Sequence, residues 1–197
     1  MRKPPHERAS DGRHAAASAW HAGRMSPRVP STVTIRRTTA DDWQQVRDLR
    51  LEMLEDTPMA YGETLATGLT HGEAEWRSRG ARGQAPHSVM VAAIDDETGE
   101  WLGTMGGYLD APGSPMLVGV YVRASRRGRE AGVADALLDT VVEWARTEGS
   151  ALTLHVHEDN ARAVAYYRRR GFEPTGVTVP YVLDPASREL ELRLPLA

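Results

Sequence analysis

The sequence predicts an α/β (α+β) fold in which a mixed central sheet of about six to seven strands carries helices on both faces. Three strand-like segments follow one another in the middle of the chain with no helix between them. After them, helical and strand-like patterns alternate until two strand-like segments end the chain. The expected order is β–α–α–β–β–β–α–β–α–β–β, within one domain over residues 32–197.

Residues 1–31 are expected to form a disordered basic tail, because they are rich in Arg, His, Ala, Ser, Gly and Pro and hold no apolar run beyond alanines. They lack the apolar core of a signal peptide, and no stretch of the chain approaches the length of a membrane span. We therefore expect a cytoplasmic protein without a membrane partner. Met25 offers an alternative start, which would leave residues 1–24 untranslated.

One strand and two helices are expected in the first part of the domain. Val33–Arg37 alternates like a strand, and Thr38–Asp42 supplies the polar side chains that cap a helix. That helix should end at Thr57–Pro58, and a loop should follow over Ala60–Thr64. A second helix is predicted over Thr70–Arg79, with its tryptophan as the buried anchor.

Three strands are expected next, over Ser88–Ile94, Trp101–Leu109 and Met116–Val122. Turn signals separate them at Asp95–Gly99 and at Ala111–Pro115. The second of these strands holds three glycines, which predicts a bulge or a close approach of another part of the chain to its backbone.

The last part of the chain should begin with a helix over Gly132–Glu148 that Gly149 caps. A strand over Ala151–Val156 and a helix over Asn160–Arg170 follow, and Gly171 should cap that helix. A closing hairpin is expected, with strands over Val177–Leu183 and Arg188–Leu194 around a turn at Asp184–Ser187.

Two motifs between residues 129 and 172 stand at a spacing that makes each support the other. The first reads Arg129-x-x-Gly132-x-Ala134 and opens a helix with a glycine-bearing turn. The free backbone N–H groups and the dipole of such a helix favour phosphate. The second motif reads Asn160-x-x-Ala163-x-x-x-Tyr167-x-x-x-Gly171-Phe172. Its amide and its phenol are seven residues apart, so they share one face of a helix.

Together the two motifs resemble the acetyl-CoA site of the GNAT superfamily of N-acetyltransferases, and the predicted order of elements is similar to the GNAT fold. The resemblance implies an acyl-CoA N-acyltransferase that transfers an acetyl group from acetyl-CoA to a primary amine, by direct attack in a ternary complex. The chain has no cysteine that could form a covalent intermediate. We expect the acceptor to be a small amine, an amino acid or an antibiotic rather than a protein N-terminus. Homodimers are common in the family, and one is an open expectation here.

The phosphate loop can be read in two registers. Arg129 in the leading position leaves the motif intact but makes the loop after Val122 longer than is usual in the family. Arg127-Gly128 in that position restores the length but puts Glu130 where a glycine is usual. A carboxylate would repel the pyrophosphate, which favours the first register. The resemblance assigns cofactor binding in this loop to Arg127, Gly128, Arg129, Gly132, Val133 and Ala134.

The strand before this loop is implied to form a splayed edge whose backbone pairs with the pantetheine arm and whose N–H receives the thioester oxygen. The residues concerned are Val120, Tyr121 and Val122. Asn160 should cap its helix, and the resemblance adds a contact to the pantetheine or the acyl group. Tyr167 is implied to protonate the departing thiolate. Its spacing from Asn160 selects it over Tyr166.

The general base stays open, because the strand before the phosphate loop contains no acid. The candidates are Glu63, Asp110, His155, His157 and Glu158, and a water relay is an equal alternative. Three tyrosines are expected to line the acceptor pocket, namely Tyr61, Tyr108 and Tyr181. The seven histidines show no spacing typical of a zinc site, so no metal is expected.

Charge argues against a nucleic-acid partner. Residues 1–30 carry six basic and two acidic side chains, and subtracting this +4 from the chain's −3 leaves −7 for residues 31–197. An acidic domain lacks the footprint of a nucleic-acid protein.

The alternative to an active acetyltransferase is a catalytically idle CoA-binding module, which senses acetyl-CoA or regulates a partner.

Overall fold

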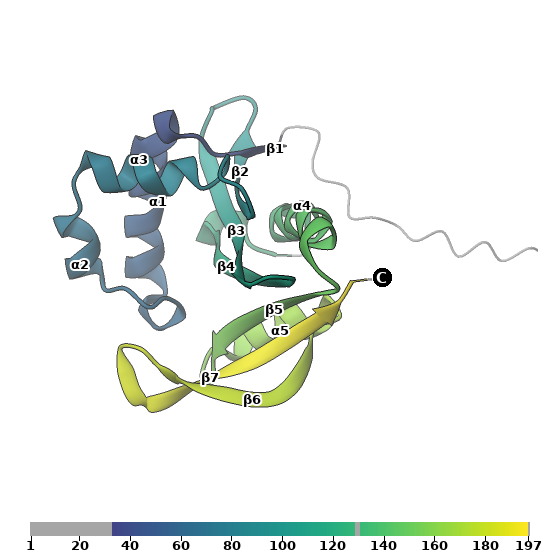
Figure 1. Cartoon of the computed structure of the whole chain (residues 1–197). Coiled ribbons are helices and arrows are strands. Elements are labelled where there is room, and N and C mark those ends of the chain that lie inside the picture. Colours follow the sequence, from purple (N-terminus) through teal and green to yellow (C-terminus); the bar gives the residue numbers. More distant parts are fainter. Residues whose placement is uncertain (1–32, 129–130, 197) are drawn as a thin grey trace, which may run out of the picture.

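The computed structural model describes residues 33–128 and 131–196, which form one seven-stranded sheet with helices on both faces (Figure 1). The strands are β1 (Val33–Arg37), β2 (Ser88–Asp95), β3 (Trp101–Ala111), β4 (Ser114–Val122), β5 (Ala151–His157), β6 (Glu173–Tyr181) and β7 (Asp184–Pro195). The α-helices are α1 (Trp43–Asp56), α2 (Leu65–Thr70), α3 (Glu73–Ala81), α4 (Val133–Glu148) and α5 (Ala161–Arg169). The predicted fold class is confirmed. The tail predicted over residues 1–31 lies outside the described residues.

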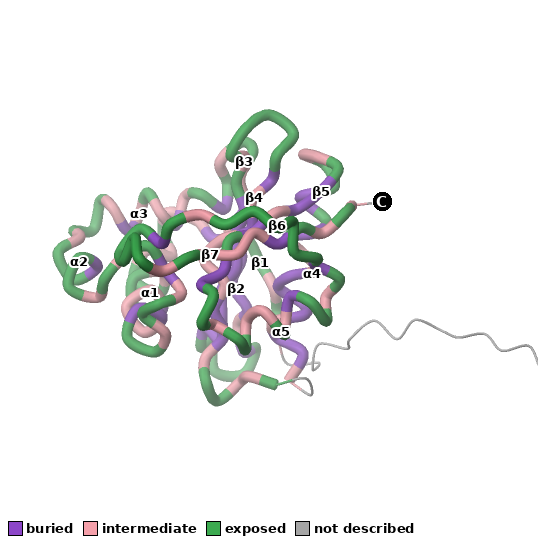
Figure 2. Tube along the Cα trace, turned by 90° about the horizontal axis from the view of Figure 1, so that it is seen from below, coloured by how far each residue is buried: buried purple, intermediate pink, exposed green. Residues whose placement is uncertain are grey.

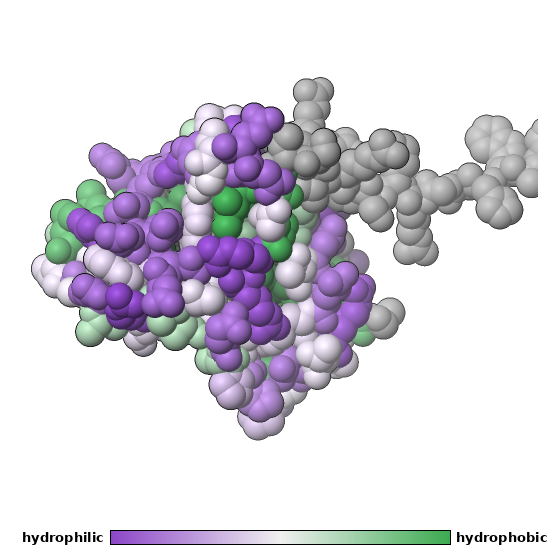
Figure 3. Space-filling model, turned by 90° about the horizontal axis from the view of Figure 1, so that it is seen from above, coloured by the Kyte–Doolittle hydropathy of each residue, from purple (hydrophilic) through white to green (hydrophobic). Residues whose placement is uncertain are grey.

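The sheet runs in the order β1-β2-β3-β4-β5-β7-β6. Every neighbouring pair is antiparallel except β4 and β5, which are parallel. One apolar cluster joins α4 and α5 to the sheet, and a second, smaller cluster joins α1 to it. Figure 2 shows that buried residues gather on the central strands and on α4, whereas α2 is largely exposed. Figure 3 shows a mostly hydrophilic face on which apolar side chains gather in a central hollow.

The first helix begins and ends where the sequence predicts. A single 3-10 turn precedes α1, and there the carboxylate of Asp42 accepts hydrogen bonds from the backbone N–H of Thr39 at 2.8 Å and from its hydroxyl at 3.0 Å. Thr57 closes α1 through a bond from its N–H to the Met53 carbonyl. Local contacts at both ends therefore fix where α1 begins and ends.

The helix predicted over Thr70–Arg79 is confirmed as α3, which starts three residues and ends two residues later than predicted, but the sequence analysis missed a separate short helix, α2, that precedes it. The hydroxyl of Thr64 caps α2 by accepting from the Thr67 N–H at 3.1 Å, and α2 ends at Thr70. Gly72 then starts α3, in which Trp76 is 1% exposed and is the anchor that was expected. Apolar periodicity could not reveal α2, since its only buried residue is a glycine.

The turns of two hairpins, β3–β4 and β6–β7, are tighter than expected. Only two residues lie between β3 and β4, one of them Gly113 with φ +76°. The turn between β6 and β7 lies at Val182 and Leu183 and not at Asp184–Ser187, because Tyr181 and Asp184 already pair across the hairpin. Val182 and Leu183 look like strand residues in the sequence, but both are exposed in the turn.

Other parts of the chain lie close to the backbone of β3, as the three glycines of this strand predict. A Cβ atom on Gly107 would lie 2.4 Å from the ring of Trp144, and one on Gly103 would lie 2.6 Å from the Tyr121 carbonyl oxygen. The absence of side chains lets α4 pack directly on β3 and so sets the thickness of the central layer.

Candidate active site

The parallel strands β4 and β5 pair only at Met116 and Thr153 and diverge beyond that point. A cleft of about 880 Å³ opens between them, and residues of α1, β4, β5, α5 and the loop before α4 line it. The divergence leaves one edge of β4 without a strand partner in the middle of the molecule. Unpaired backbone groups at such an edge are available to an extended ligand.

A β-bulge shapes the exposed edge of β4. The pairing with β3 shifts by one residue between Thr104 and Gly106, and Gly119, in the strand opposite, has φ +60°. The bulge breaks the regular alternation of the backbone near Val120. The predicted edge residues Val120, Tyr121 and Val122 all line the cleft.

Side chains from neighbouring elements reach this edge. The Tyr61 hydroxyl donates to the Val120 carbonyl oxygen at 3.0 Å, and Nε of Arg127 donates to that of Val122 at 2.6 Å. The Tyr121 hydroxyl donates to Glu52 at 3.0 Å. Two carbonyl groups of the edge therefore have hydrogen-bond partners within the chain.

Two glycines before α4 have positive φ angles. Gly132 is the N-cap of α4 and is left-handed, with φ +64°, and Gly128 has φ +119°. Both glycines and Ala134 line the cleft, whereas Val133 is buried in the core next to it. The turn therefore aims the N-terminal end of α4 at the cleft.

Arg127 also lines the cleft, but its guanidinium is bound to α1 through an ion pair with Asp56. The same group lies 5.3 Å from the centre of the Tyr121 ring. Arg129 and Glu130 lie outside the described residues, so the choice between the two registers stays a prediction.

Asn160 is the N-cap of α5, as expected, since its Oδ1 accepts from the Ala163 N–H at 3.2 Å. It also lines the cleft. Its side-chain NH₂ group makes no hydrogen bond within the described residues, which leaves two donors for a ligand.

Tyr167 and Tyr166 both line the cleft but differ in what their hydroxyls do. The Tyr166 hydroxyl donates to the Ala134 carbonyl oxygen at 2.9 Å and so joins α5 to α4. The Tyr167 hydroxyl has no such partner among the described residues, and burial raises the pKa of Tyr167 well above its ordinary value. The buried phenol is therefore protonated at neutral pH and can act as a donor.

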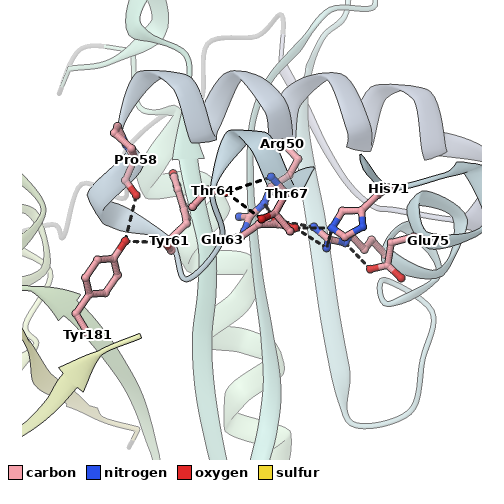
Figure 4. A network of polar contacts seen from close by, with 10 residues as sticks. Arg50, Pro58, Tyr61, Glu63, Thr64, Thr67, His71, Glu75 and Tyr181 are labelled. Atoms are coloured by element: carbon pink, nitrogen blue, oxygen red, sulfur yellow. Dashed lines mark hydrogen bonds and ion pairs between the residues drawn. The ribbon is translucent and has the colours of Figure 1, made fainter. Parts of the chain in front are cut away.

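Glu63, a candidate base, is held by three cationic or polar side chains (Figure 4). Its two oxygens accept from Arg79 at 2.9 Å each, from Arg50 at 2.9 Å and from His71 at 2.7 Å. Burial alone would raise the pKa of Glu63, but these bonds outweigh it and lower the pKa to about 2. Such a carboxylate is a weak base.

Two other candidate bases lie away from the cleft lining. Asp110 is exposed at the end of β3, and Glu158 is exposed and accepts from the Arg188 N–H at 2.8 Å. His155 and His157 do line the cleft. Nδ1 of His157 accepts from the Asp159 N–H at 3.2 Å, so the nitrogen that could take up a proton is already engaged.

Glu189 lines the cleft and is a residue that the sequence pattern does not reveal. It pairs with His157 across β5 and β7, so the two side chains share one face of the sheet. The alternation of acidic and apolar residues along β7 indicates that Glu189 lies on the polar face of the strand. It does not indicate that this face borders the cleft.

Of the three tyrosines expected in an acceptor pocket, Tyr61 and Tyr108 line the cleft. Tyr181 is not part of the cleft lining but contacts a residue that is, because its hydroxyl donates to the Tyr61 carbonyl oxygen at 2.9 Å (Figure 4). The β6–β7 hairpin thereby holds the loop after α1 in place.

No helix in the described part of the chain is long and apolar enough to cross a membrane. Within residues 33–128 and 131–196, no group of three acidic or histidine side chains is arranged to hold a metal ion.

Comparison with known proteins identifies the family. A profile of the acetyltransferase (GNAT) family matches residues 43–172. No curated protein sequence matches the chain. The chain belongs to the GNAT family, a class of transferases that takes acetyl-CoA as the acyl donor.

Solved structures agree with the family. A GCN5-related N-acetyltransferase from Kribbella flavida is 24% identical, covers 85% of this chain and 99% of its own, and superposes with a TM-score of 0.67. yncA from Salmonella typhimurium, solved with its cofactor acetyl-CoA, is 16% identical, covers 85% of this chain and 95% of its own, and superposes with a TM-score of 0.69. A ribosomal-protein-alanine N-acetyltransferase from Brucella melitensis is 23% identical, covers 83% of this chain and 99% of its own, and superposes with a TM-score of 0.65. At these identities the likeness shows the fold.

Proposed function

We propose that the protein transfers an acetyl group from acetyl-CoA to a primary amine of a small molecule, by direct attack in a ternary complex. The observation that carries this proposal is the convergence on one cleft of the bulged β4 edge, the left-handed glycine turn before α4, and Tyr167. The structure of yncA with acetyl-CoA lends support, since its fold is shared.

Cofactor binding is proposed for the backbone of the β4 edge and for the turn before α4. The pantetheine arm would lie along Val120–Val122, and the pyrophosphate would lie at the N-terminal end of α4. The residues proposed for the phosphates are Arg127, Gly128, Arg129, Gly132, Val133 and Ala134. Val133 contributes its backbone, because its side chain belongs to the core. Arg127 would exchange its contact with Asp56 for the phosphate.

The chemistry follows from this placement. The amine loses a proton and its nitrogen attacks the thioester carbon, and a backbone N–H of the β4 edge stabilises the oxyanion that forms. When the carbon–sulfur bond breaks, the thiolate takes its proton from the Tyr167 hydroxyl, and the former amine nitrogen, which still carries one proton too many, gives that proton back to the tyrosinate, directly or through water. Asn160 offers its free NH₂ group to the pantetheine or the acyl group. For the first proton we propose a water relay that ends at His155 or at the solvent, because Glu63 and His157 are already engaged.

The alternative, an idle CoA-binding module, predicts binding without turnover. It is not favoured, since both Asn160 and Tyr167 line the cleft. Acetyl transfer can be tested by following thiol release from acetyl-CoA with a panel of small amines and a peptide with an N-terminal alanine, and by identifying the products by mass spectrometry. Release with a small amine would support the proposal. Release only with the peptide would move the acceptor to proteins, and tight acetyl-CoA binding with no release would favour the idle module.

A further inference from the structure

A second recess of about 490 Å³ adjoins the main cleft between α1, α3 and the start of α2. We call it the arginine recess. It is lined by Arg50, Gly62, Glu63, Thr64, Thr67, His71, Arg79, Arg82 and Leu183. Three arginines and Gly62 line both the recess and the main cleft, so the two spaces share part of their walls.

The lining of the arginine recess carries a surplus of positive charge. Glu63 is the one acid in the lining of the recess, against three arginines and a histidine. Arg79 is fully engaged, because its Nε donates to Glu75 at 2.7 Å and its two other nitrogens donate to Glu63. The low pKa of Glu63 agrees with this surplus of positive charge, since cations around a carboxyl favour its charged form.

Two of the arginines keep donors free for a ligand. Arg50 contacts Glu63 through Nε and one terminal nitrogen, and its Nη1 has no partner in the described part of the chain. Arg82 makes no ion pair or side-chain hydrogen bond within residues 33–128 and 131–196, and it is exposed at the end of α3. Guanidinium groups with free donors bind carboxylates and phosphonates, often through two parallel hydrogen bonds.

Tyr61 connects the arginine recess to the edge where the thioester is placed. The Arg50 guanidinium lies 4.9 Å from the centre of the Tyr61 ring, and the Tyr61 hydroxyl bonds the Val120 carbonyl oxygen. The Tyr61 side chain therefore lies between the Arg50 guanidinium and the β4 edge. A small acceptor with its amine at that edge can place a second group in the recess.

We propose that the acceptor is an amine that also carries an anionic group, a carboxylate or a phosphonate, and that the arginine recess binds this group. The inference rests on the proposed function for the amine end of the acceptor. It excludes polyamines as good acceptors, because a second ammonium group would face Arg50 and Arg82.

The test compares matched acceptors in the thiol-release assay, with amino acids from 3-aminopropanoate to 6-aminohexanoate set against alkylamines of equal chain length. For wild type we expect the best amino acid to exceed its alkylamine in kcat/KM by at least about tenfold, which is what one charge-assisted hydrogen bond supplies. Arg82→Glu should reduce this ratio to about one or below, because it removes a donor and places a carboxylate where the anionic group would bind. Arg146→Glu reverses the same charge on an exposed position of α4 and should keep the ratio. A ratio near one in wild type, or one that Arg82→Glu leaves unchanged, would overturn the proposal.

A binding measurement separates this inference from the proposed function. Glutarate, which has no amine, is titrated calorimetrically into the CoA-loaded wild type and into both variants. Binding that Arg82→Glu abolishes and Arg146→Glu preserves would support the anionic recess even if no amine were acetylated. No binding to wild type, together with turnover of alkylamines, would leave the acetyltransferase in place and remove the recess.

Discussion

The Tyr61 hydroxyl donates a hydrogen bond to the Val120 carbonyl oxygen across 3.0 Å, and this bond joins the loop after α1 to the bulged edge of β4. Tyr181 extends the connection, because its hydroxyl holds the Tyr61 carbonyl from the β6–β7 hairpin. The two halves of the sheet, which separate beyond Met116, are thus tied together across the cleft by side chains.

Tyr61→Phe should lower the free energy of unfolding by about 1 kcal/mol, the usual net value of one hydrogen bond. Urea unfolding followed by tryptophan fluorescence measures the change. Tyr108→Phe is the matched control, since Tyr108 is 41% exposed and its hydroxyl bonds none of the described residues. Equal stability losses in the two variants would remove the Tyr61–Val120 bond from this account.

Tyr167→Phe should lower kcat by about 10²-fold or more, the usual contribution of a general acid, and leave the dissociation constant of acetyl-CoA unchanged. The measurement needs single-turnover rates, which isolate chemistry from product release. Tyr166→Phe should behave in the opposite way, with reduced stability from the lost bond to Ala134 and a nearly normal rate. A normal single-turnover rate in Tyr167→Phe would show that another group protonates the thiolate.

Gly132→Ala should weaken acetyl-CoA binding by about tenfold or more and also destabilise the chain by about 1–2 kcal/mol, because alanine is strained at φ +64°. Gly113→Ala imposes the same kind of strain at φ +76° in the β3–β4 turn, away from the cleft. Calorimetric titration should show normal acetyl-CoA affinity in that control. If both variants bound the cofactor equally well, the turn before α4 would not be the phosphate site.

The Glu63→Gln variant tests whether Glu63 holds its neighbouring side chains in position or acts as the general base. The pKa of Glu63 is about 2 in the folded chain, below its ordinary value of about 4.3, so its contribution to stability is complete above the unfolded pKa and is lost as the pH falls toward 2. The stability gap between wild type and Glu63→Gln should therefore be largest near neutral pH and shrink at pH 3.

Unfolding in urea at pH 7, 5 and 3 gives this gap directly. The acidic limb of the pH–rate profile should persist in Glu63→Gln, because the base lies elsewhere. Loss of that limb, with a stability gap that does not change with pH, would make Glu63 the base after all.

The fold was largely predictable because its signals are local. Strand alternation, helix caps and glycine turns place most elements to within a few residues, and residues of both motifs line the cleft. The errors lie where local pattern is weak or misleading. In α2 only a glycine is buried, and in the last hairpin the apolar pair Val182–Leu183 forms an exposed turn.

Much of the site could not be predicted, because it depends on contacts between distant residues. The ion pair of Arg127 with Asp56 joins residues 71 positions apart, and the Glu63 cluster draws on three helices or their ends. Sequence spacing cannot show that Glu63 is already satisfied by Arg50 and Arg79. The register of the phosphate loop stays a prediction for a different reason, because Arg129 and Glu130 lie outside the described residues.

Thermal unfolding with and without acetyl-CoA tests the central claim most directly, with ATP as the control nucleotide. Acetyl-CoA at about a hundred times its dissociation constant should add on the order of 2.7 kcal/mol of stability and raise the midpoint by several degrees, and ATP should not. A folded sample whose midpoint acetyl-CoA does not move would contradict the cofactor site formed by β4, the turn before α4, and α5.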